Sequence, residues 1–158
     1  MSTFTEQDHF WMQHALKLAH QALHANEVPV GAVLILNDEI IGEGFNAPIS
    51  SQDPTAHAEI IAIRNAAEKI QNYRLINSAL YVTLEPCLMC AGAIVHSRIQ
   101  RLVYGANDPR TGVIDSCAQL LQAPFLNHRV ISHGGLLKEE CGLMLKKFFQ
   151  ARRHQKKL

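Results

Sequence analysis

The sequence lacks any long hydrophobic run, and no segment approaches the roughly 20 consecutive apolar residues that a membrane-spanning helix needs. Its start, Met1–Asp8, also lacks the basic and apolar regions of a secretory signal peptide. Internal repeats and low-complexity linkers are missing as well. These absences predict a cytoplasmic protein without a membrane partner, folded as one domain over residues 1–158.

Cysteine is scarce, with four residues in the chain. Disulfide bonds are disfavoured in the cytoplasm, so each cysteine is expected to be a metal ligand or a core residue. Cys117 and Cys141 are isolated in the sequence and are interpreted as small core residues. Cys87 and Cys90, in contrast, have the Cys-x-x-Cys spacing that is typical of metal sites.

Charge is unevenly distributed, although the net charge is only +1. Residues 146–158 contain six of the fifteen basic residues and no acidic one, so the remainder has nine basic against fourteen acidic side chains, a net of −5. A basic helix over about residues 138–158 on a mildly acidic body indicates a polyanionic partner. A solvated terminal helix with no partner is the alternative interpretation.

Hydrophobic periodicity predicts helices that alternate with strands. Helices are expected over about 6–25, from a cap at Asp53 or Thr55 to about residue 70, over 86–96 and over 138–153, and strands over 31–36, 40–44, 79–84, 101–104 and 129–131. The apolar face of the second helix is expected to contain Ile60, Ile61, Ile63, Ala67 and Ile70. Pro86 is expected at the first position of the third helix.

This order of elements predicts an α/β fold in which helices and one five-stranded sheet form layers. The sheet should begin with an antiparallel hairpin over residues 31–44 and continue through right-handed crossovers. The helix over residues 86–96 is apolar nearly all round, so it must be covered on every side, either within the monomer or by another subunit.

The most specific chemical signal combines His57 and Glu59 with Cys87 and Cys90, thirty residues further on. The cysteines fall at a predicted helix start, where unpaired N–H groups and the helix dipole favour the metal-binding thiolate. Three protein ligands leave one coordination position of zinc for water, as in catalytic sites. Zinc lowers the pKa of such a water towards about 7, and Glu59 is expected to accept its proton.

A Cys-x-x-Cys pair alone is also compatible with a redox couple or a structural zinc site. The interior Leu88-Met89 and the upstream His-x-Glu disfavour a redox couple. A structural site needs a fourth ligand, and the candidates lack ligand-type spacing or are interpreted as surface or core residues: Cys117, Cys141, His96, His128 and His133. The combination of His-x-Glu with Pro-Cys-x-x-Cys is the signature of zinc-dependent nucleobase deaminases.

Over nearly its whole length the chain resembles the bacterial tRNA-specific adenosine deaminases, a family of the zinc-dependent cytidine and deoxycytidylate deaminase superfamily. The resemblance rests on residues 27–33, 53–59, 72–75, 81–93, 104–108 and 127–130. It implies a cytidine-deaminase-like three-layer α/β/α sandwich with a mixed five-stranded sheet. It also implies a homodimer that converts adenosine to inosine at the wobble position of a tRNA anticodon loop.

The same resemblance implies roles for individual residues. His57, Cys87 and Cys90 would hold one Zn²⁺ per subunit, and Glu59 would be the proton shuttle. Asn46 would contact the flipped nucleoside, a four-residue loop would shape the base pocket, Asp108 would lie near the neighbouring nucleotide, and two arginines would lie near phosphates. The loop residues are Glu27, Val28, Pro29 and Val30, and the arginines are Arg152 and Arg153.

Two other functions are compatible with the zinc signature. A deaminase of a small nucleobase or nucleoside, such as guanine or cytosine, would have the same ligands, but the basic helix suits RNA phosphates and has no use for a neutral base. A non-catalytic, zinc-stabilised RNA-binding module would have no use for a spare carboxylate such as Glu59 beside its metal.

Overall fold

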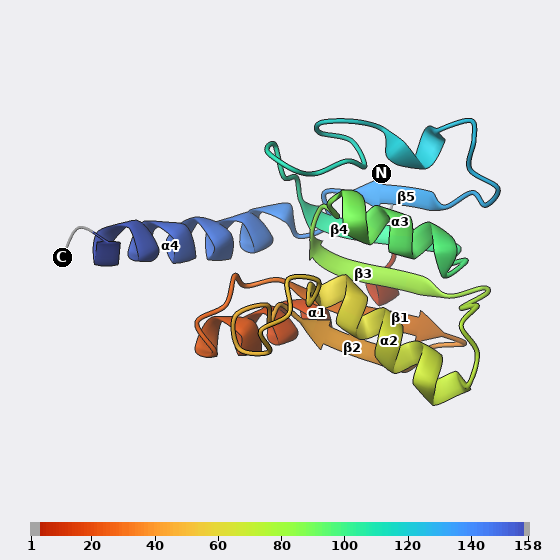
Figure 1. The fold of residues 1–158 in the computed structure, drawn as a ribbon, viewed down its shortest axis with the longest axis horizontal. Helices are drawn as coiled ribbons and strands as arrows, with labels where there is room; N and C mark the ends of the chain where they lie inside the picture. Colours follow the sequence, from red (N-terminus) through yellow and green to blue (C-terminus); the bar gives the residue numbers. More distant parts are fainter. Residues whose placement is uncertain (1–3, 157–158) are drawn as a thin grey trace.

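The computed structural model describes residues 4–156, which form four α-helices, one 3-10 helix and five strands (Figure 1). In chain order the elements are α1 Glu6–His24, β1 Gly31–Leu36, β2 Glu39–Phe45, α2 Ala58–Ile70, β3 Ala79–Leu84, α3 Leu88–His96, β4 Arg101–Ala106, the 3-10 helix η1 Leu120–Gln122, β5 Ile131–Gly134 and α4 Lys138–Lys156.

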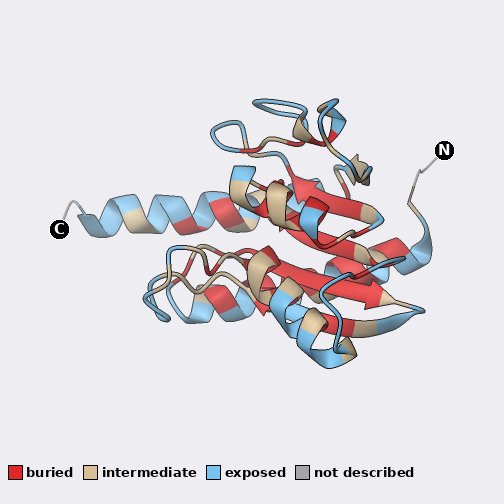
Figure 2. Ribbon diagram, turned by 45° about the vertical axis from the view of Figure 1, so that its right-hand side comes forward, coloured by how far each residue is buried: buried red, intermediate tan, exposed pale blue. Residues whose placement is uncertain are grey.

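The five strands form one mixed sheet in the order β2-β1-β3-β4-β5. β1 pairs antiparallel with β2 and β3, whereas β3, β4 and β5 are mutually parallel. α2 and α3 cover one face and α1 the other; α4 packs beside α1 on the ends of the central strands and then projects beyond the sheet (Figures 1 and 2). The predicted α/β fold with a mixed five-stranded sheet is confirmed.

A tight turn closes the β1–β2 hairpin at Asn37 and Asp38, whose φ angles are 52° and 61°. Positive φ at both central residues is the mark of a type I′ turn, whose twist matches that of paired strands. The hairpin returns the chain so that Phe45 pairs with Gly31 at the end of β2. Asn46, the next residue, is thereby delivered to the start of α2.

Helix α2 packs on β2 mainly through alanines, and the predicted apolar face is confirmed only in part, since Ile63, Ala67 and Ile70 pack against the core but are not fully buried. Ala58, Ala62 and Ala66 are fully buried, whereas each isoleucine of the helix keeps part of its surface exposed. The cause lies in the strand, because Gly42 and Gly44 have no side chain to hold the helix away. A Cβ atom on Gly44 would lie 2.4 Å from the carbonyl oxygen of Ala58. Small residues on both elements therefore set the depth at which α2 lies.

The starts of α2 and α3 also differ from the prediction. His57 is the N-cap of α2, while Asp53 accepts hydrogen bonds from the backbone N–H and the hydroxyl of Thr55 in the preceding turn. Cys87 is the N-cap of α3, so Pro86 lies outside that helix. Both helices thus begin with metal-binding side chains at the position that Ser, Thr or Asp usually occupies.

The remaining elements match their predicted ranges apart from their ends. The last strand is Ile131–Gly134 rather than 129–131, because its pairing begins where the Ile131 N–H meets the Gln100 carbonyl oxygen. Helix α4 reaches Lys156, and the predicted extension of the basic helix to residues 157–158 lies outside the described residues. Within residues 4–156, no helix combines the length and apolarity that crossing a membrane requires.

Asp8, in the first turn of α1, anchors that helix to the sheet through a buried ion pair. Its carboxylate accepts hydrogen bonds from Arg101 at 2.7 and 3.1 Å and from the Tyr81 hydroxyl at 2.7 Å. A reciprocal capping box joins it to Thr5. Burial by itself would raise the pKa of Asp8, but the hydrogen bonds from Arg101 and Tyr81 hold that pKa well below its usual range.

Asp8→Asn is expected to lower the free energy of unfolding near neutral pH by about 3 kcal/mol, because it leaves the Arg101 charge without its buried partner. The folded-state pKa of Asp8 lies below the reference value of 3.8, so the ion pair stabilises the fold above that pH and this stabilisation is lost as the pH falls below it. Urea unfolding of both proteins across the acid range measures the difference. A difference that stays constant on acidification would contradict the assigned pKa direction.

Candidate metal centre and adjoining cavity

The N-termini of α2 and α3 bring three metal-binding side chains together. His57 and Cys87 are N-cap residues with extended backbone, and Cys90 lies in the first turn of α3. Nδ1 of His57 is 3.6 Å from Sγ of Cys87 and 3.6 Å from Sγ of Cys90. All three donor atoms lie within 4.8 Å of one another, and residues 4–156 contain no other such group of His, Cys, Asp or Glu side chains.

These separations fit zinc. Tetrahedral zinc, with Zn–S near 2.3 Å and Zn–N near 2.0 Å, holds a sulfur and a nitrogen ligand about 3.5 Å apart. The donor set of two thiols and one imidazole is also one that zinc commonly uses. A set of three protein ligands is that of a catalytic site, since a structural site would be closed by a fourth.

The charge of the two sulfurs points to a cation as well. The hydrogen bond with Cys90 lowers the pKa of Cys87 to about 4, an effect that His57 reinforces. The same contact, together with burial, raises the pKa of Cys90 far above its usual range, and the contact with Cys87 raises the pKa of His57. The opposite pKa shifts mean that, without a metal, the pair holds one negative charge. A divalent ion bound between the sulfurs would favour the thiolate form of both.

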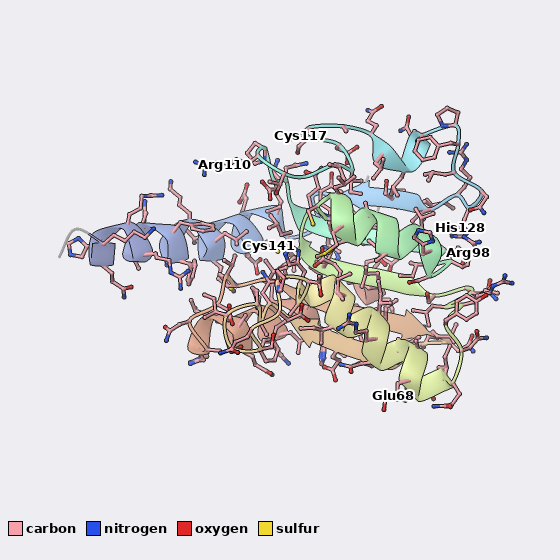
Figure 3. All side chains as sticks on the ribbon, in the orientation of Figure 1. Glu68, Arg98, Arg110, Cys117, His128 and Cys141 are labelled. Atoms are coloured by element: carbon pink, nitrogen blue, oxygen red, sulfur yellow. The ribbon has the colours of Figure 1, made fainter. Side chains whose placement is uncertain are left out.

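None of the five residues considered as a fourth ligand joins this group of donor atoms within residues 4–156. The prediction that Cys117 is a core residue is wrong, because its thiol is exposed and donates to the Pro109 carbonyl oxygen in the loop after β4. Cys141 is buried at the start of α4, as predicted (Figure 3). Nε2 of His128 lies 2.7 Å from the Ile99 carbonyl oxygen, at the end of α3 where Arg98 also lies (Figure 3). A closed, structural zinc site is therefore not supported.

Glu59 lies beside the cluster, in the first turn of α2, with only 4% of its surface exposed. Burial raises the pKa of Glu59 to about 7; the charge of Cys87 adds to this, whereas a contact with Cys90 opposes it. The carboxylate is close to the sulfurs yet outside the set of three converging donor atoms. A carboxylate in this position can exchange a proton with a molecule bound at the cluster without being one of the three converging donors.

Asn46 and Glu27, two of the predicted substrate residues, hold the segment between β2 and α2. Oδ1 of Asn46 accepts the N–H of Ala58 at 2.8 Å, which ties the end of the hairpin to the first turn of α2. Glu27 is 1% exposed, and its carboxylate accepts the N–H groups of Ile49 and Ser50 at 3.3 and 2.7 Å. Glu27 therefore shapes the surroundings of the site through the backbone of this segment.

A cavity of about 520 Å³ lies at the carboxyl ends of β3 and β4, next to the segment that carries Cys87. Three predicted substrate residues line it, together with two other side chains of α4, of which the lysine belongs to the basic segment: Val28, Asp108, Arg153, Lys146 and Phe149. Pro29 and Val30 are buried and do not line this cavity. The end of β3 therefore connects the two sites, because Leu84 lines the cavity and Cys87 follows three residues later.

Arg152 and Arg153, which were predicted together, face different parts of the molecule. Arg153 lines the 520 Å³ cavity, whereas Arg152 donates to the Asn26 carbonyl oxygen at 2.9 Å. The Arg152 guanidinium also lies over the ring of Phe148, 4.8 Å from its centroid, in the groove between α1 and α4. Consecutive helical residues point about 100° apart, so helix geometry alone accounts for the divergence.

Glu85, like Asp8, is a buried polar residue whose role the sequence did not indicate. It follows β3 directly and precedes Pro86, with 2% of its surface exposed. Burial alone would raise its pKa, but hydrogen bonds from Asp115, Ser116 and Asp108 lower the pKa of Glu85 to about 2. A carboxylate beside a Pro-Cys motif is visible in the sequence, but nothing there reveals that a distant loop donates to it.

A His, Cys, Cys cluster at the starts of two helices, on one face of a mixed sheet, defines the class of zinc-dependent deaminases. The chain belongs to the cytidine and deoxycytidylate deaminase family, whose zinc-binding region matches residues 5–106. It is 56% identical to the tRNA-specific adenosine deaminase of Haemophilus influenzae over 98% of this chain and 90% of that protein. The tRNA-specific adenosine deaminase of Bacillus subtilis is 45% identical, over 96% and 94% of the respective chains.

Solved structures agree with this assignment. A chain from a study of A-to-I editing by tRNA:A34 deaminases at the wobble position of transfer RNA has a TM-score of 0.84 and 43% identity, covering 86% of this chain and 99% of that one. Guanine deaminase from Nitrosomonas europaea has a TM-score of 0.73 and 22% identity, covering 89% and 83%, which shows a shared fold. The family resemblance noted in the sequence is confirmed.

Proposed function

We propose that this protein hydrolyses adenosine to inosine at the wobble position of tRNA anticodon loops. The observation that carries the proposal is the buried carboxylate of Glu59 beside the converging donors of His57, Cys87 and Cys90. Hydrolysis at a three-ligand metal site requires a group that accepts a proton from the bound water, and this carboxylate can do so. A structural metal site has no need of such a group. The sequence identity of 42–56% to tRNA-specific adenosine deaminases supports the choice of substrate.

In this proposal His57, Cys87 and Cys90 hold one Zn²⁺ per chain, within a single deaminase domain that spans residues 1–158. Bound zinc would supply an activated water for attack on C6 of adenine. Glu59 takes a proton from that water and delivers it to the ring nitrogen N1. It then carries the proton of the new C6 hydroxyl to the amino group, so that the C–N bond breaks, ammonia leaves and the C6 carbonyl of inosine remains. One water is consumed and one ammonia is released for each inosine formed.

The lining of the cavity favours RNA over a free base. Lys146 and Arg153 suit phosphates, and Phe149 offers a face on which a base can stack. Asp108, on the opposite wall, is proposed to meet the nucleotide beside the target adenosine. Asn46 and the Glu27–Val30 loop are proposed to shape the pocket of the flipped base.

A homodimer is proposed from the surface of α3. Leu88 is 66% exposed, and Met89, Gly92 and Ala93 are only partly covered, so one apolar side of this helix is open in the monomer. A second copy of the chain would cover it, as the apolar character of the helix requires. Sedimentation of the purified protein tests the proposal, and a monomer at every concentration would count against it.

The deciding experiment uses short stem-loops with a single adenosine or cytidine, placed in the loop or in the paired stem. We expect inosine from the loop adenosine and far less product from the paired one, since an unpaired base enters the pocket at low unstacking cost. Binding should weaken steeply as salt increases. Uridine from cytidine alone, or no product at all, would refute the proposed reaction.

The same assay separates the alternatives. Ammonia release from guanine or cytosine, with no effect of RNA, would indicate a small-base deaminase. Salt-sensitive RNA binding without any ammonia would indicate a non-catalytic module.

A further inference from the structure

Glu85 is surrounded by hydrogen-bond donors that come from one loop. Its Oε1 accepts from the Asp108 N–H at 3.0 Å, the Asn107 amide at 3.2 Å and the Ser116 hydroxyl at 2.5 Å. Its Oε2 accepts the N–H groups of Ile114, Asp115 and Ser116 at 3.0, 2.8 and 2.9 Å. One carboxylate therefore gathers both ends of residues 107–116.

This loop is one wall of the 520 Å³ cavity. Asp108, Arg110 and Thr111 line the cavity from the loop side, facing Lys146 and Arg153 of α4. Figure 3 shows Arg110 at the outer part of the loop, above the start of α4. The loop has no helix or strand of its own before η1, so its shape depends on the bonds that it makes with the body of the protein.

Two backbone contacts add to the hold on the loop and tie it to the metal segment. The Glu85 N–H donates to the Ala106 carbonyl oxygen at 2.8 Å, and the Val113 N–H donates to the Pro86 carbonyl oxygen at 3.1 Å. A single residue, Pro86, separates Glu85 from Cys87. Three consecutive residues therefore connect the cavity wall to the metal centre: Glu85 and Pro86 bind the loop, and Cys87 belongs to the donor cluster.

We propose that Glu85 is the positioning residue that fixes residues 107–116 as the RNA-binding wall of the cavity in register with the metal centre. The role is positioning rather than catalysis, because every hydrogen bond that the carboxylate accepts within residues 4–156 comes from this loop. The assignment of the cavity to RNA rests on the proposed function; the hold of Glu85 on the loop does not.

Glu85→Gln is the informative variant, because it keeps shape while replacing one oxygen by a donor. A glutamine NH₂ on the Oε2 side would face three backbone N–H groups, none of which can turn. On the Oε1 side the Asn107 amide can flip and the Ser116 hydroxyl can accept, so only the Asp108 N–H loses its acceptor. The glutamine is therefore expected to release the Asp108 end of the loop.

In steady-state assays with a loop-adenosine stem-loop, Glu85→Gln should raise KM about tenfold and change kcat less than about threefold, with zinc content unchanged. The increase should be smaller in an Asp108→Ala background, since the two residues act together. Asp8→Asn is the matched control: it also removes a buried carboxylate, but outside the cavity, and should leave KM unchanged. A lower kcat at unchanged KM, or additive effects with Asp108→Ala, would overturn the positioning role.

Amide hydrogen exchange gives a readout that does not depend on activity. The amide of Asp108 should exchange faster in Glu85→Gln, whereas those of residues 114–116 should change less, because they keep one oxygen as acceptor. Glu68→Ala, which removes an exposed carboxylate, should leave exchange in the loop at the wild-type rate. Unchanged exchange in a folded Glu85→Gln variant would overturn the proposal. Faster exchange in a protein whose wild type makes no inosine would refute the proposed function and leave the hold on the loop intact.

Ser116→Ala is a second test of the proposal, which can be used if Glu85→Gln does not fold. It deletes one hydroxyl donor at the other end of the loop and leaves the carboxylate with its backbone partners. We expect a KM increase of about twofold to threefold, smaller than that of Glu85→Gln because most of the hydrogen bonds remain. An unchanged KM together with unchanged exchange at residues 114–116 would contradict the proposal.

Discussion

Replacing Glu59 with alanine is expected to lower kcat by about 10²–10⁴-fold, the range that general acid–base catalysis contributes. Zinc content should stay at the wild-type level, because the Glu59 carboxylate is outside the His57, Cys87, Cys90 donor set. Single-turnover inosine formation and elemental analysis of the same preparation measure the two quantities.

Glu68→Ala is the control for this prediction. Glu68 lies on the same helix but at its exposed, far end (Figure 3), so removing its carboxylate should affect neither activity nor metal. Full activity of Glu59→Ala would contradict the proton-carrier role, and loss of zinc from it would show that Glu59 is a ligand.

Cys87→Ala is expected to lose zinc, activity and stability together. Metal binding contributes to folding because the ligand set is assembled only in the folded chain. A ligand present at 1,000 times its dissociation constant adds about 4 kcal/mol, so its loss should lower Tm by roughly 10 °C for a chain of this size. Thermal unfolding with and without added zinc, alongside metal content, provides the measurement.

Cys117→Ala is the matched control, since its thiol is exposed and lies outside the cluster (Figure 3). It should keep zinc, Tm and activity. Stoichiometric zinc in Cys87→Ala, or an equal Tm loss in Cys117→Ala, would exclude the proposed ligand set.

The metal centre could be located from the sequence because its chemistry is local. Zinc at an incomplete site needs imidazole and thiolate donors, and helix starts favour thiolate, so residue type and spacing together identify His57, Cys87 and Cys90. The first residue of each of these helices was harder to predict from the sequence. Whether Pro86 or Leu88 begins α3 depends on how the chain leaves β3, which no periodicity records.

The apolar face of α2 was predicted only in part, because Ile63, Ala67 and Ile70 pack against the core as expected but three alanines are buried more deeply. Isoleucines at helical spacing predict a face, but the face that a helix buries depends on what the opposing surface admits. Gly42 and Gly44 open β2 to a close approach, and the alanines of α2 fit there while larger side chains would be excluded.

The predicted substrate residues divide in the same way. Val28, Asp108 and Arg153 come together at one cavity although they are far apart in the chain. Glu27, in contrast, accepts hydrogen bonds from backbone N–H groups of the 46–55 segment. Arg152 donates to a backbone carbonyl oxygen in the turn that follows α1. Motif similarity marks positions that matter without telling whether a side chain faces a ligand or supports the backbone.

By itself, the sequence determined the alternation of helices and strands, the metal-binding residue types and the basic end of the chain, because these depend on short-range periodicity and on donor chemistry. Only the tertiary structure decided which helix face is buried, that Arg152 and Arg153 diverge, and that Glu85 holds a loop more than twenty residues away. Those outcomes depend on the close packing of distant segments and on buried donors finding acceptors, which no local pattern encodes.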